Sequence, residues 1–502
     1  MSGTAIDSGS AVTSEKENRL SFYMNPKLIK DISASSAQIF LNQFLGLIIF
    51  LITSRFLPKT VYGEMNWSLA VLVFVTSIIS LRLDYIVVRR VAAGQEAPKL
   101  LTVFTGHIVF FGVIFYLALL VGSILYPSFF RRHDLLLILA ISQLLTFFST
   151  PFKNVANGEE KFGYLATMSS IAALIRAIGL LVIISYFQLS IQSVLVIFIV
   201  SSLIELIVSW YFVTWRMRIR FTTRVRFGDY KQLLHESLPQ IGVAVLMAGI
   251  TRMDWILLGL FTTASKTAEY SFAYRVYELS PFPLLIIAPV LLSRFARYFS
   301  THSDQDILLE KQKISLLVRT EMILATFIPL VLNIIWAPAI DSLTANKYGA
   351  INRVTFFILS CCIPFQYINN LLWSANFAQH RLKLIFRITF ITFCVILVGD
   401  LVFIPLYNAK GAALVYLTAM VIEYINSMRS SQLAKIKELW SSLFICATIA
   451  AVSGFSAMYF FKGIVYQLGF ASTVFLLLIA ATRQFRKTDI LYILSAVNRK
   501  KT

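Results

Sequence analysis

The chain has 502 residues, of which 58% are hydrophobic and only 14% are charged, and its formal net charge is +20 at pH 7. About a quarter of the residues in an ordinary soluble domain are charged, so this composition leaves too little polar surface for a soluble fold. The apolar residues come in blocks of about 20, the length of a helix that crosses a bilayer. Long continuous blocks favour helices over a β-barrel, so the sequence predicts an all-α polytopic membrane protein.

In chain order, a polar leader over residues 1–32 is followed by fourteen expected transmembrane helices. They lie at residues 33–54, 65–88, 101–126, 134–152, 163–187, 190–214, 234–260, 269–292, 314–337, 351–375, 384–406, 411–428, 441–461 and 464–482. Most Lys and Arg residues fall in the connectors of one side, which the positive-inside rule assigns to the cytoplasm. We therefore expect a multi-pass protein of the plasma (inner) membrane with both termini cytoplasmic. This placement explains the positive charge without a nucleic-acid partner.

Two connectors resemble each other and suggest an internal repeat. Lys59-Thr60 is followed by Gly63-Glu64, and Lys266-Thr267 is followed by Ala268-Glu269, 205 residues after Gly63. This offset equals six spans, so the repeat predicts two six-helix lobes related by a pseudo-two-fold axis along the membrane normal. The expected organisation is a leader at 1–32, lobes at 33–215 and 234–428, two additional helices at 441–482 and a basic cytoplasmic tail at 483–502.

The connectors also bear on catalysis. Those expected outside the membrane are short, and no glycine-rich phosphate loop or zinc-spaced His/Cys cluster is present. The four cysteines all fall within expected spans, which favours small buried residues over disulfides or a metal site. We therefore expect no enzyme activity, no metal and no cofactor. A membrane-embedded enzyme of glycan assembly stays as a disfavoured alternative.

Several stretches resemble a known family: Ser54–Glu64, Leu83–Arg90, Ser237–Gly242, Arg252–Gly259 and Ala268–Tyr274. Together they are similar to the Wzx-type polysaccharide and O-antigen flippases of the multidrug/oligosaccharidyl-lipid/polysaccharide (MOP) exporter superfamily. The resemblance implies two lobes around a central cavity and alternating access. It also implies transport of a polyprenyl-diphosphate-linked oligosaccharide from the cytoplasmic to the outer leaflet, for O-antigen, capsule or exopolysaccharide biosynthesis. An ion-coupled drug or metabolite antiporter of the same superfamily is the alternative.

Four arginines are expected inside spans: Arg82, Arg176, Arg252 and Arg275. A charge inside the bilayer is costly and normally faces the protein interior. The guanidinium group stays charged and can bind phosphate oxygens in a bidentate manner, so these residues are candidates for a cationic cavity that receives the diphosphate. Internal ion pairing is the alternative, with Arg275 and Glu278 at i,i+3 as one expected pair.

Other polar residues extend the candidate site. Amides at helical spacing are expected to line the cavity, since a side-chain amide facing lipid is costly; small-residue stripes alone would instead indicate helix packing. These amides are Gln43, Gln240, Gln366, Asn369 and Asn370.

Carboxylates inside spans can bind a proton or Na⁺, or bond to a neighbouring helix. Asp254, Glu205 and Glu423 are therefore candidates for coupling transport to an H⁺ or Na⁺ gradient. The expected partners are the lipid-linked oligosaccharide, membrane lipids, and glycan polymerase and chain-length proteins.

Overall fold

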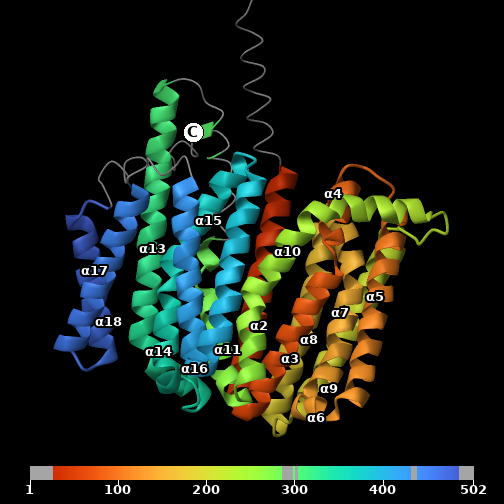
Figure 1. Cartoon of the computed structure of the whole chain (residues 1–502), viewed down its shortest axis with the longest axis horizontal. Helices are drawn as coiled ribbons and strands as arrows, with labels where there is room; N and C mark the ends of the chain where they lie inside the picture. The colour runs from red at the N-terminus through yellow and green to blue at the C-terminus, as the bar shows by residue number, and fades with distance from the viewer. Residues whose placement is uncertain (1–25, 285–294, 296–297, 300–303, 431–437, 485–502) are drawn as a thin grey trace, which may run out of the picture. The chain divides into compact units, whose positions relative to one another are not determined.

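The computed structural model describes residues 26–284, 295, 298–299, 304–430 and 438–484. Within these residues the chain is helical and contains no β-strand (Figure 1). Side-chain caps mark several helix starts. The Ser190 hydroxyl accepts a hydrogen bond from the Ser193 backbone N–H at 3.2 Å, and Thr263 caps Lys266 in the same way at 3.4 Å. The expected all-α fold is confirmed.

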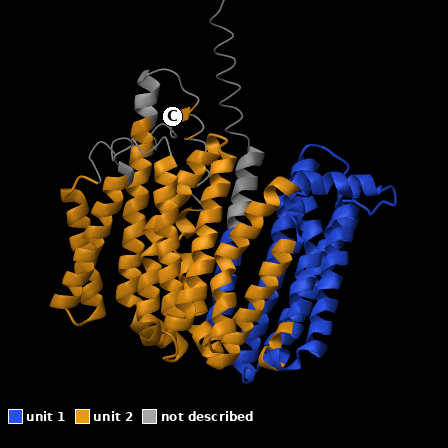
Figure 2. Ribbon diagram, viewed as in Figure 1, with its two compact units in different colours: residues 1–52, 79–130, 137–237 blue, residues 53–78, 131–136, 238–502 orange. Residues whose placement is uncertain are grey.

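The chain forms two compact units, coloured separately in Figure 2. Unit 1 comprises residues 1–52, 79–130 and 137–237, and its core includes Leu83, Leu101, Phe104, Val155 and Met168. Its helices are α4 (Leu83–Ala92), α5 (Ala97–Leu125), α7 (Leu135–Gly158), α8 (Phe162–Tyr186), α9 (Ile191–Tyr211) and the π-helical turn η1 (Phe212–Arg216), with the short α6 (Pro127–Arg132) at its edge.

Unit 2 comprises residues 53–78, 131–136 and 238–502. Helix α13 packs against both α17 and α18, and α15 packs against α16. Two long helices, α2 (Pro26–Phe56) and α10 (Phe227–Phe261), contribute residues to both units. The other helices of unit 2 are α3 (Lys59–Ile79), α11 (Ala264–Leu279), α13 (Asp304–Thr344), α14 (Gly349–Ser360), α15 (Cys362–Ala378), α16 (Leu382–Ser430), α17 (Glu438–Phe460) and α18 (Ile464–Ala481).

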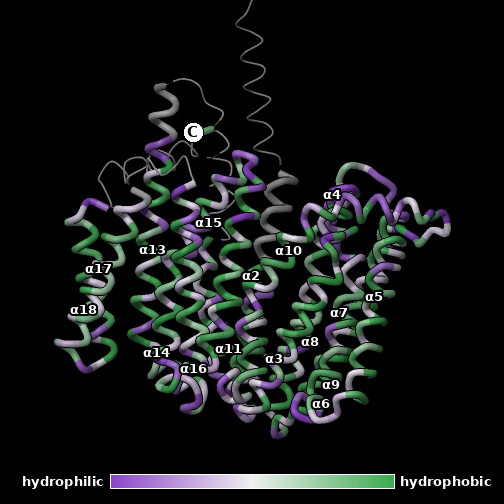
Figure 3. The backbone as a smooth tube through the Cα atoms, in the orientation of Figure 1, coloured by the Kyte–Doolittle hydropathy of each residue, from purple (hydrophilic) through white to green (hydrophobic). Residues whose placement is uncertain are grey.

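Twelve helical segments of the described residues are long and apolar enough to cross a membrane. Figure 3 shows hydrophobic residues along the helices and hydrophilic residues gathered near many of their ends. The second expected span, 65–88, is wrong as a single helix. Helix α3 ends at Ile79 and α4 starts at Leu83, because Leu81 and Arg82 adopt left-handed conformations with φ of 47° and 59°.

Helix α16 contains the eleventh and twelfth expected spans and reverses direction between them. Asn408, with φ of 53° and ψ of −132°, interrupts the helical backbone. The Arg381 guanidinium donates to the Ser430 carbonyl at 3.0 Å, although a straight helix of this length would separate them by about 70 Å. A Cβ on Gly399 would likewise lie 2.6 Å from a Val415 methyl group. The two spans are therefore antiparallel neighbours.

The eighth expected span, 269–292, begins in α11, and its end lies outside the described residues. Most of the leader (1–25) and most of the tail (485–502) also lie outside them. The expected pair of C-terminal helices is present as α17 and α18. The total of fourteen spans and the symmetry of two lobes stay predictions.

Candidate functional site

Arg176 lies on α8 in unit 1 and is held by hydroxyl groups. Its Nε donates to Ser201 at 2.8 Å and one Nη donates to Ser202 at 2.7 Å, both on α9. The guanidinium carbon lies 4.6 Å from the centre of the Phe198 ring, a cation–π distance. Among the described residues, Arg176 forms no ion pair with a carboxylate. The guanidinium group is therefore held in a fixed orientation, and no direct ionic partner among the described residues neutralises its charge.

Glu205, one helical turn from Ser201, belongs to the same polar network. Its side chain is buried and pairs with Lys153 of α7. Thr146 and Ser149 of α7 each donate to a Glu205 carboxylate oxygen at 3.4 Å. Lys153 was expected in a connector, because the fourth span was placed at 134–152, but α7 continues to Gly158.

The polar face of α7 that contributes to this network has a regular spacing. Ser142, Thr146, Ser149 and Lys153 follow one another at steps of four, three and four residues, which places them on one helix face. The Ser142 hydroxyl also bonds to that of Ser202, at 2.9 Å. This spacing is the sequence signal that could have identified the polar face of α7.

In unit 2, Arg252 of α10 and Arg275 of α11 share a single carboxylate, Glu278. Arg252 Nη1 lies 3.1 Å from Glu278 Oε1, and Arg275 Nη1 lies 2.9 Å from Oε2. The expected i,i+3 pair of Arg275 and Glu278 is thus present, while the partner of Arg252 had not been identified. The guanidinium of Arg252 also lies 5.1 Å from the Trp255 ring centre. Two positive charges and one negative charge meet at this point.

Asp254 lies in the same unit but has a different environment. Its carboxylate accepts a hydrogen bond from the Tyr270 hydroxyl at 2.5 Å and another from the Trp255 backbone N–H at 2.8 Å. It is 1% exposed, and it interacts electrostatically with Asp400, which is 0% exposed. Among the described residues, neither oxygen of Asp400 has a hydrogen-bond partner. Two buried carboxylates beside a phenol form a donor set suited to a proton or Na⁺.

The remaining sequence candidates are dispersed. Arg82 immediately precedes α4 at the helix break and makes no side-chain capping hydrogen bond; its side chain is 43% exposed and 3.9 Å from Asp84. Its placement inside a span was therefore wrong. Gln43 is exposed and Gln240 is partly buried. Glu423 is partly buried and pairs with none of the described residues.

Helix α15 carries three of the expected amides. Asn369 donates to the Met420 carbonyl at 3.1 Å, but its own oxygen has no partner among the described residues. The oxygen of Gln366 and the nitrogen of Asn370 are likewise buried without a partner. Because buried polar atoms are normally satisfied, these three atoms suggest contact with water or a ligand. A further carboxylate of this kind, Glu321 on α13, was not among the ion-coupling candidates.

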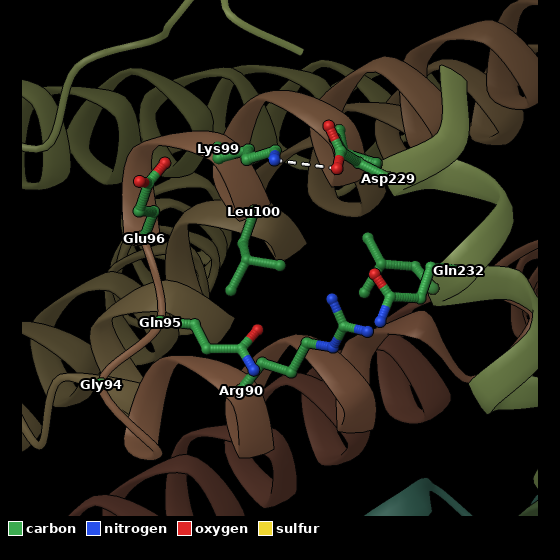
Figure 4. Close-up of a pocket in the computed structure, with 10 residues that line it drawn as sticks. Arg90, Gly94, Gln95, Glu96, Lys99, Leu100, Asp229 and Gln232 are labelled. Atoms are coloured by element: carbon green, nitrogen blue, oxygen red, sulfur yellow. Dashed lines mark ion pairs between the residues drawn. The ribbon is translucent and has the colours of Figure 1, made fainter. Parts of the chain in front are cut away.

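A separate pocket of about 380 Å³ lies in unit 1 between the α4–α5 connection and the first turns of α10 (Figure 4). Three of its four charged lining residues form ion pairs with each other or with a neighbour. Lys99 lies 2.8 Å from Asp229, and Arg90 pairs with Glu236. These pairs fasten the start of α10 to α4 and α5, so the pocket is best explained as a structural junction.

Comparison with known proteins identifies the family. Residues 28–299, more than half of the chain, match the family described as "Polysaccharide biosynthesis protein". The sequence has no significant match among the curated proteins.

Solved structures share the fold at low identity. The lipid II flippase MurJ in an inward closed conformation has a TM-score of 0.70 and 16% identity, covering 90% of this chain and 98% of that one. An inward-facing multidrug resistance MATE family transporter of the MOP superfamily has a TM-score of 0.61 and 12% identity, and the match covers 80% of this chain and 96% of the transporter. A MOP superfamily transporter from Pyrococcus furiosus has a TM-score of 0.54 and 11% identity, and the match covers 84% of this chain and 97% of the transporter. The chain therefore belongs to the polysaccharide biosynthesis protein family and has the fold of the MOP-superfamily transporters.

Proposed function

We propose that this protein flips a polyprenyl-diphosphate-linked oligosaccharide from the cytoplasmic to the outer leaflet of the plasma (inner) membrane, by alternating access. The family is one of polysaccharide biosynthesis, and the similar structures include a lipid II flippase. The product would enter the synthesis of a surface polysaccharide such as O-antigen (lipopolysaccharide), capsule or exopolysaccharide. Glycan polymerase and chain-length proteins are the proposed partners that consume it.

The observation that supports this proposal is that Arg176 has no direct ionic partner among the described residues; Glu205, which acts on it electrostatically, is already paired with Lys153. A lipid diphosphate brings negative charge into the membrane, where solvation is poor and neutralisation by the protein is required. Arg176 forms no ion pair among the described residues, while Ser201 and Ser202 fix its orientation. A guanidinium held by neutral hydroxyls keeps its charge for an incoming anion. Arg252 and Arg275 add a second cationic cluster, in which two guanidinium groups share the Glu278 carboxylate.

Energy for transport is proposed to come from an H⁺ or Na⁺ gradient through Asp254. Its carboxylate is buried beside Tyr270 and interacts with the buried Asp400, so loss or gain of a cation there changes the local charge by one unit. Glu205 and Glu423 are weaker proposals. Glu205 already has Lys153 as its ionic partner, and Glu423 forms no side-chain hydrogen bond or ion pair with a described residue.

The test is an export assay in cells that depend on this protein for their surface glycan. Arg176→Ala, Arg176→Gln and Arg252→Ala should abolish glycan export while leaving protein abundance and membrane insertion unchanged. Arg176→Lys should retain export in part, since lysine keeps the positive charge but cannot form the bidentate hydrogen bonds of a guanidinium group. Arg353→Ala is the matched control, because Arg353 is an exposed helical arginine.

Two results would contradict the proposal. Wild-type export by the Arg176→Ala, Arg252→Ala double variant would exclude both residues from substrate binding. If Arg252→Ala instead lowered protein abundance, and Glu278→Gln in the same chain restored it, Arg252 would be a structural partner of Glu278.

The same fold is used by multidrug resistance transporters, so a drug or metabolite antiporter is the second candidate. The family favours the glycan substrate. Resistance to cationic drugs that tracks with expression, together with unchanged glycan export in a deletion strain, would favour the antiporter.

A further inference from the structure

Glu278 stands out because two arginines from different helices bind its two oxygen atoms. Arg252 of α10 reaches Oε1 at 3.1 Å, and Arg275 of α11 reaches Oε2 at 2.9 Å. The carboxylate is thus clamped from both sides. Arginine pairs bind two oxygens of a phosphate group in the same manner, through charge-assisted hydrogen bonds.

The cluster is open to displacement. The side chains of Arg252, Arg275 and Glu278 are 20%, 41% and 24% exposed, so none of the three is sealed in the core. Part of each side chain is therefore accessible to an approaching anion. Arg252 also has a contact that does not depend on Glu278, since it lies against the Trp255 ring. An anion of higher charge could therefore replace the carboxylate without dismantling the position of Arg252.

We propose that Glu278 is an internal competitor for the substrate, occupying the phosphate position between Arg252 and Arg275 whenever no substrate is bound. This inference rests on the proposed function, in which these arginines receive a diphosphate. A diphosphate carries more negative charge and more acceptor oxygens than one carboxylate, so it displaces Glu278. Singly charged anions compete poorly, because they offer the arginines no more than Glu278 already does.

The arrangement also promotes release. When the diphosphate leaves, the Glu278 carboxylate returns to both arginines, so their positive charges are never left unpaired. A protein without this competitor would bind the head group more tightly and discharge it more slowly. Glu278 is therefore a specificity-determining residue whose removal should raise affinity and lower turnover.

A matched control exists on the same helix. Glu269 of α11 is also shared by two cations, Lys59 at 2.7 Å and Lys266 at 2.9 Å. The proposal assigns it no contact with substrate. Comparing Glu278→Gln with Glu269→Gln separates a specific competitor from a general gain of positive charge.

The experiment measures equilibrium binding of radiolabelled pyrophosphate to the purified full-length protein, together with the rate of glycan export in cells. Glu278→Gln should tighten pyrophosphate binding about tenfold, which corresponds to about 1.4 kcal/mol, and should reduce export at saturating substrate. Glu269→Gln should leave the pyrophosphate affinity unchanged. Arg252→Ala should abolish the binding. Thermal unfolding of each variant checks that the protein is folded.

The outcomes separate this inference from the proposed function. If Arg252→Ala abolishes pyrophosphate binding but Glu278→Gln leaves it unchanged or weaker, the arginine site stands and the competitor role is wrong. Equal tightening by Glu269→Gln would also reject it, as a non-specific charge effect. If Arg252→Ala leaves the binding unchanged, the arginine does not receive the diphosphate, and both proposals fail at this position. Should Glu278→Gln not fold, Glu278→Asp should still give tighter binding, because its shorter side chain cannot reach both arginines.

Discussion

Asp254 and Asp400 are two buried carboxylates that interact electrostatically, and such a pair favours the binding of a proton or another cation over two negative charges. If Na⁺ is that cation, adding NaCl should raise the thermal unfolding temperature of the wild-type protein relative to equal KCl. At about one hundred times the dissociation constant, the stabilisation should be about 2.7 kcal/mol. Asp254→Asn and Asp400→Asn should each remove this difference.

A proton in place of Na⁺ gives another pattern. Export would then respond to a pH gradient and not to a sodium gradient, and both Asn variants would lose that response. Glu321→Gln is the comparison, since Glu321 is equally buried but lies on α13; loss of the response in this variant as well would mean that coupling is not confined to the aspartate pair. Gradient-driven export by the Asp254→Asn, Asp400→Asn double variant would show that coupling occurs elsewhere.

At the scale of single elements, α3 and α11 meet at Gly63, the position that the repeat aligns with Ala268. A Cβ at position 63 would lie 1.8 Å from the Ala264 carbonyl oxygen and 3.0 Å from the Ala268 nitrogen. Both atoms belong to backbone, so no side-chain rotation can relieve the clash. Gly63→Ala should therefore force α3 and α11 apart and destabilise unit 2 by about 2 kcal/mol or more. Thermal unfolding of the purified protein measures the change.

Gly106 provides the comparison. It lies within α5, and no atom is found within 4 Å of a Cβ built there. Gly106→Ala should be neutral or stabilising by about 0.5–1 kcal/mol, because alanine favours the helix. Equal stability of the Gly63→Ala and Gly106→Ala proteins would contradict the close packing of α3 on α11.

Hydropathy was sufficient to predict most helices, and it failed where a break depends on backbone conformation. The apolar block of the second span continues through Leu81 and Arg82. Their left-handed backbone conformations cannot be recognised from hydropathy. The break therefore places Arg82 in the connection before α4 and not within a continuous helix. The reversal near Asn408 was predictable, because polar residues separate two apolar blocks there.

The candidate site was predicted by residue type but not by partner. The charges of Arg176, Arg252 and Asp254 inside apolar blocks identify them as unusual from the sequence. Only Arg275 and Glu278 lie close enough in sequence for their pairing to be predicted. The pairing of Arg252 with Glu278, and the approach of Asp400 to Asp254, depend on packing between helices distant in sequence.

For the whole molecule, the charge distribution and the reversal of α16 predict one topology. Arg381 and Ser430 meet at the two ends of α16, so both ends lie on the same side of the membrane. The positive-inside rule assigns that side to the cytoplasm, which places Lys410, just after the reversal, outside. The same rule places Arg131 and Lys347 outside and Arg220 inside.

Single cysteines test this topology in a variant in which the four native cysteines are replaced by serine or alanine. A membrane-impermeant thiol reagent added to intact cells should label cysteine at positions 131, 347 and 410. Cysteine at positions 220, 381 and 429 should be labelled only after the membrane is opened. The result for position 410 is expected because each half of α16 is predicted to cross the membrane, with residues 381 and 430 on the same side. Labelling of positions 381 and 410 from the same side would mean that α16 is a re-entrant hairpin, and the prediction of fourteen spans would be wrong.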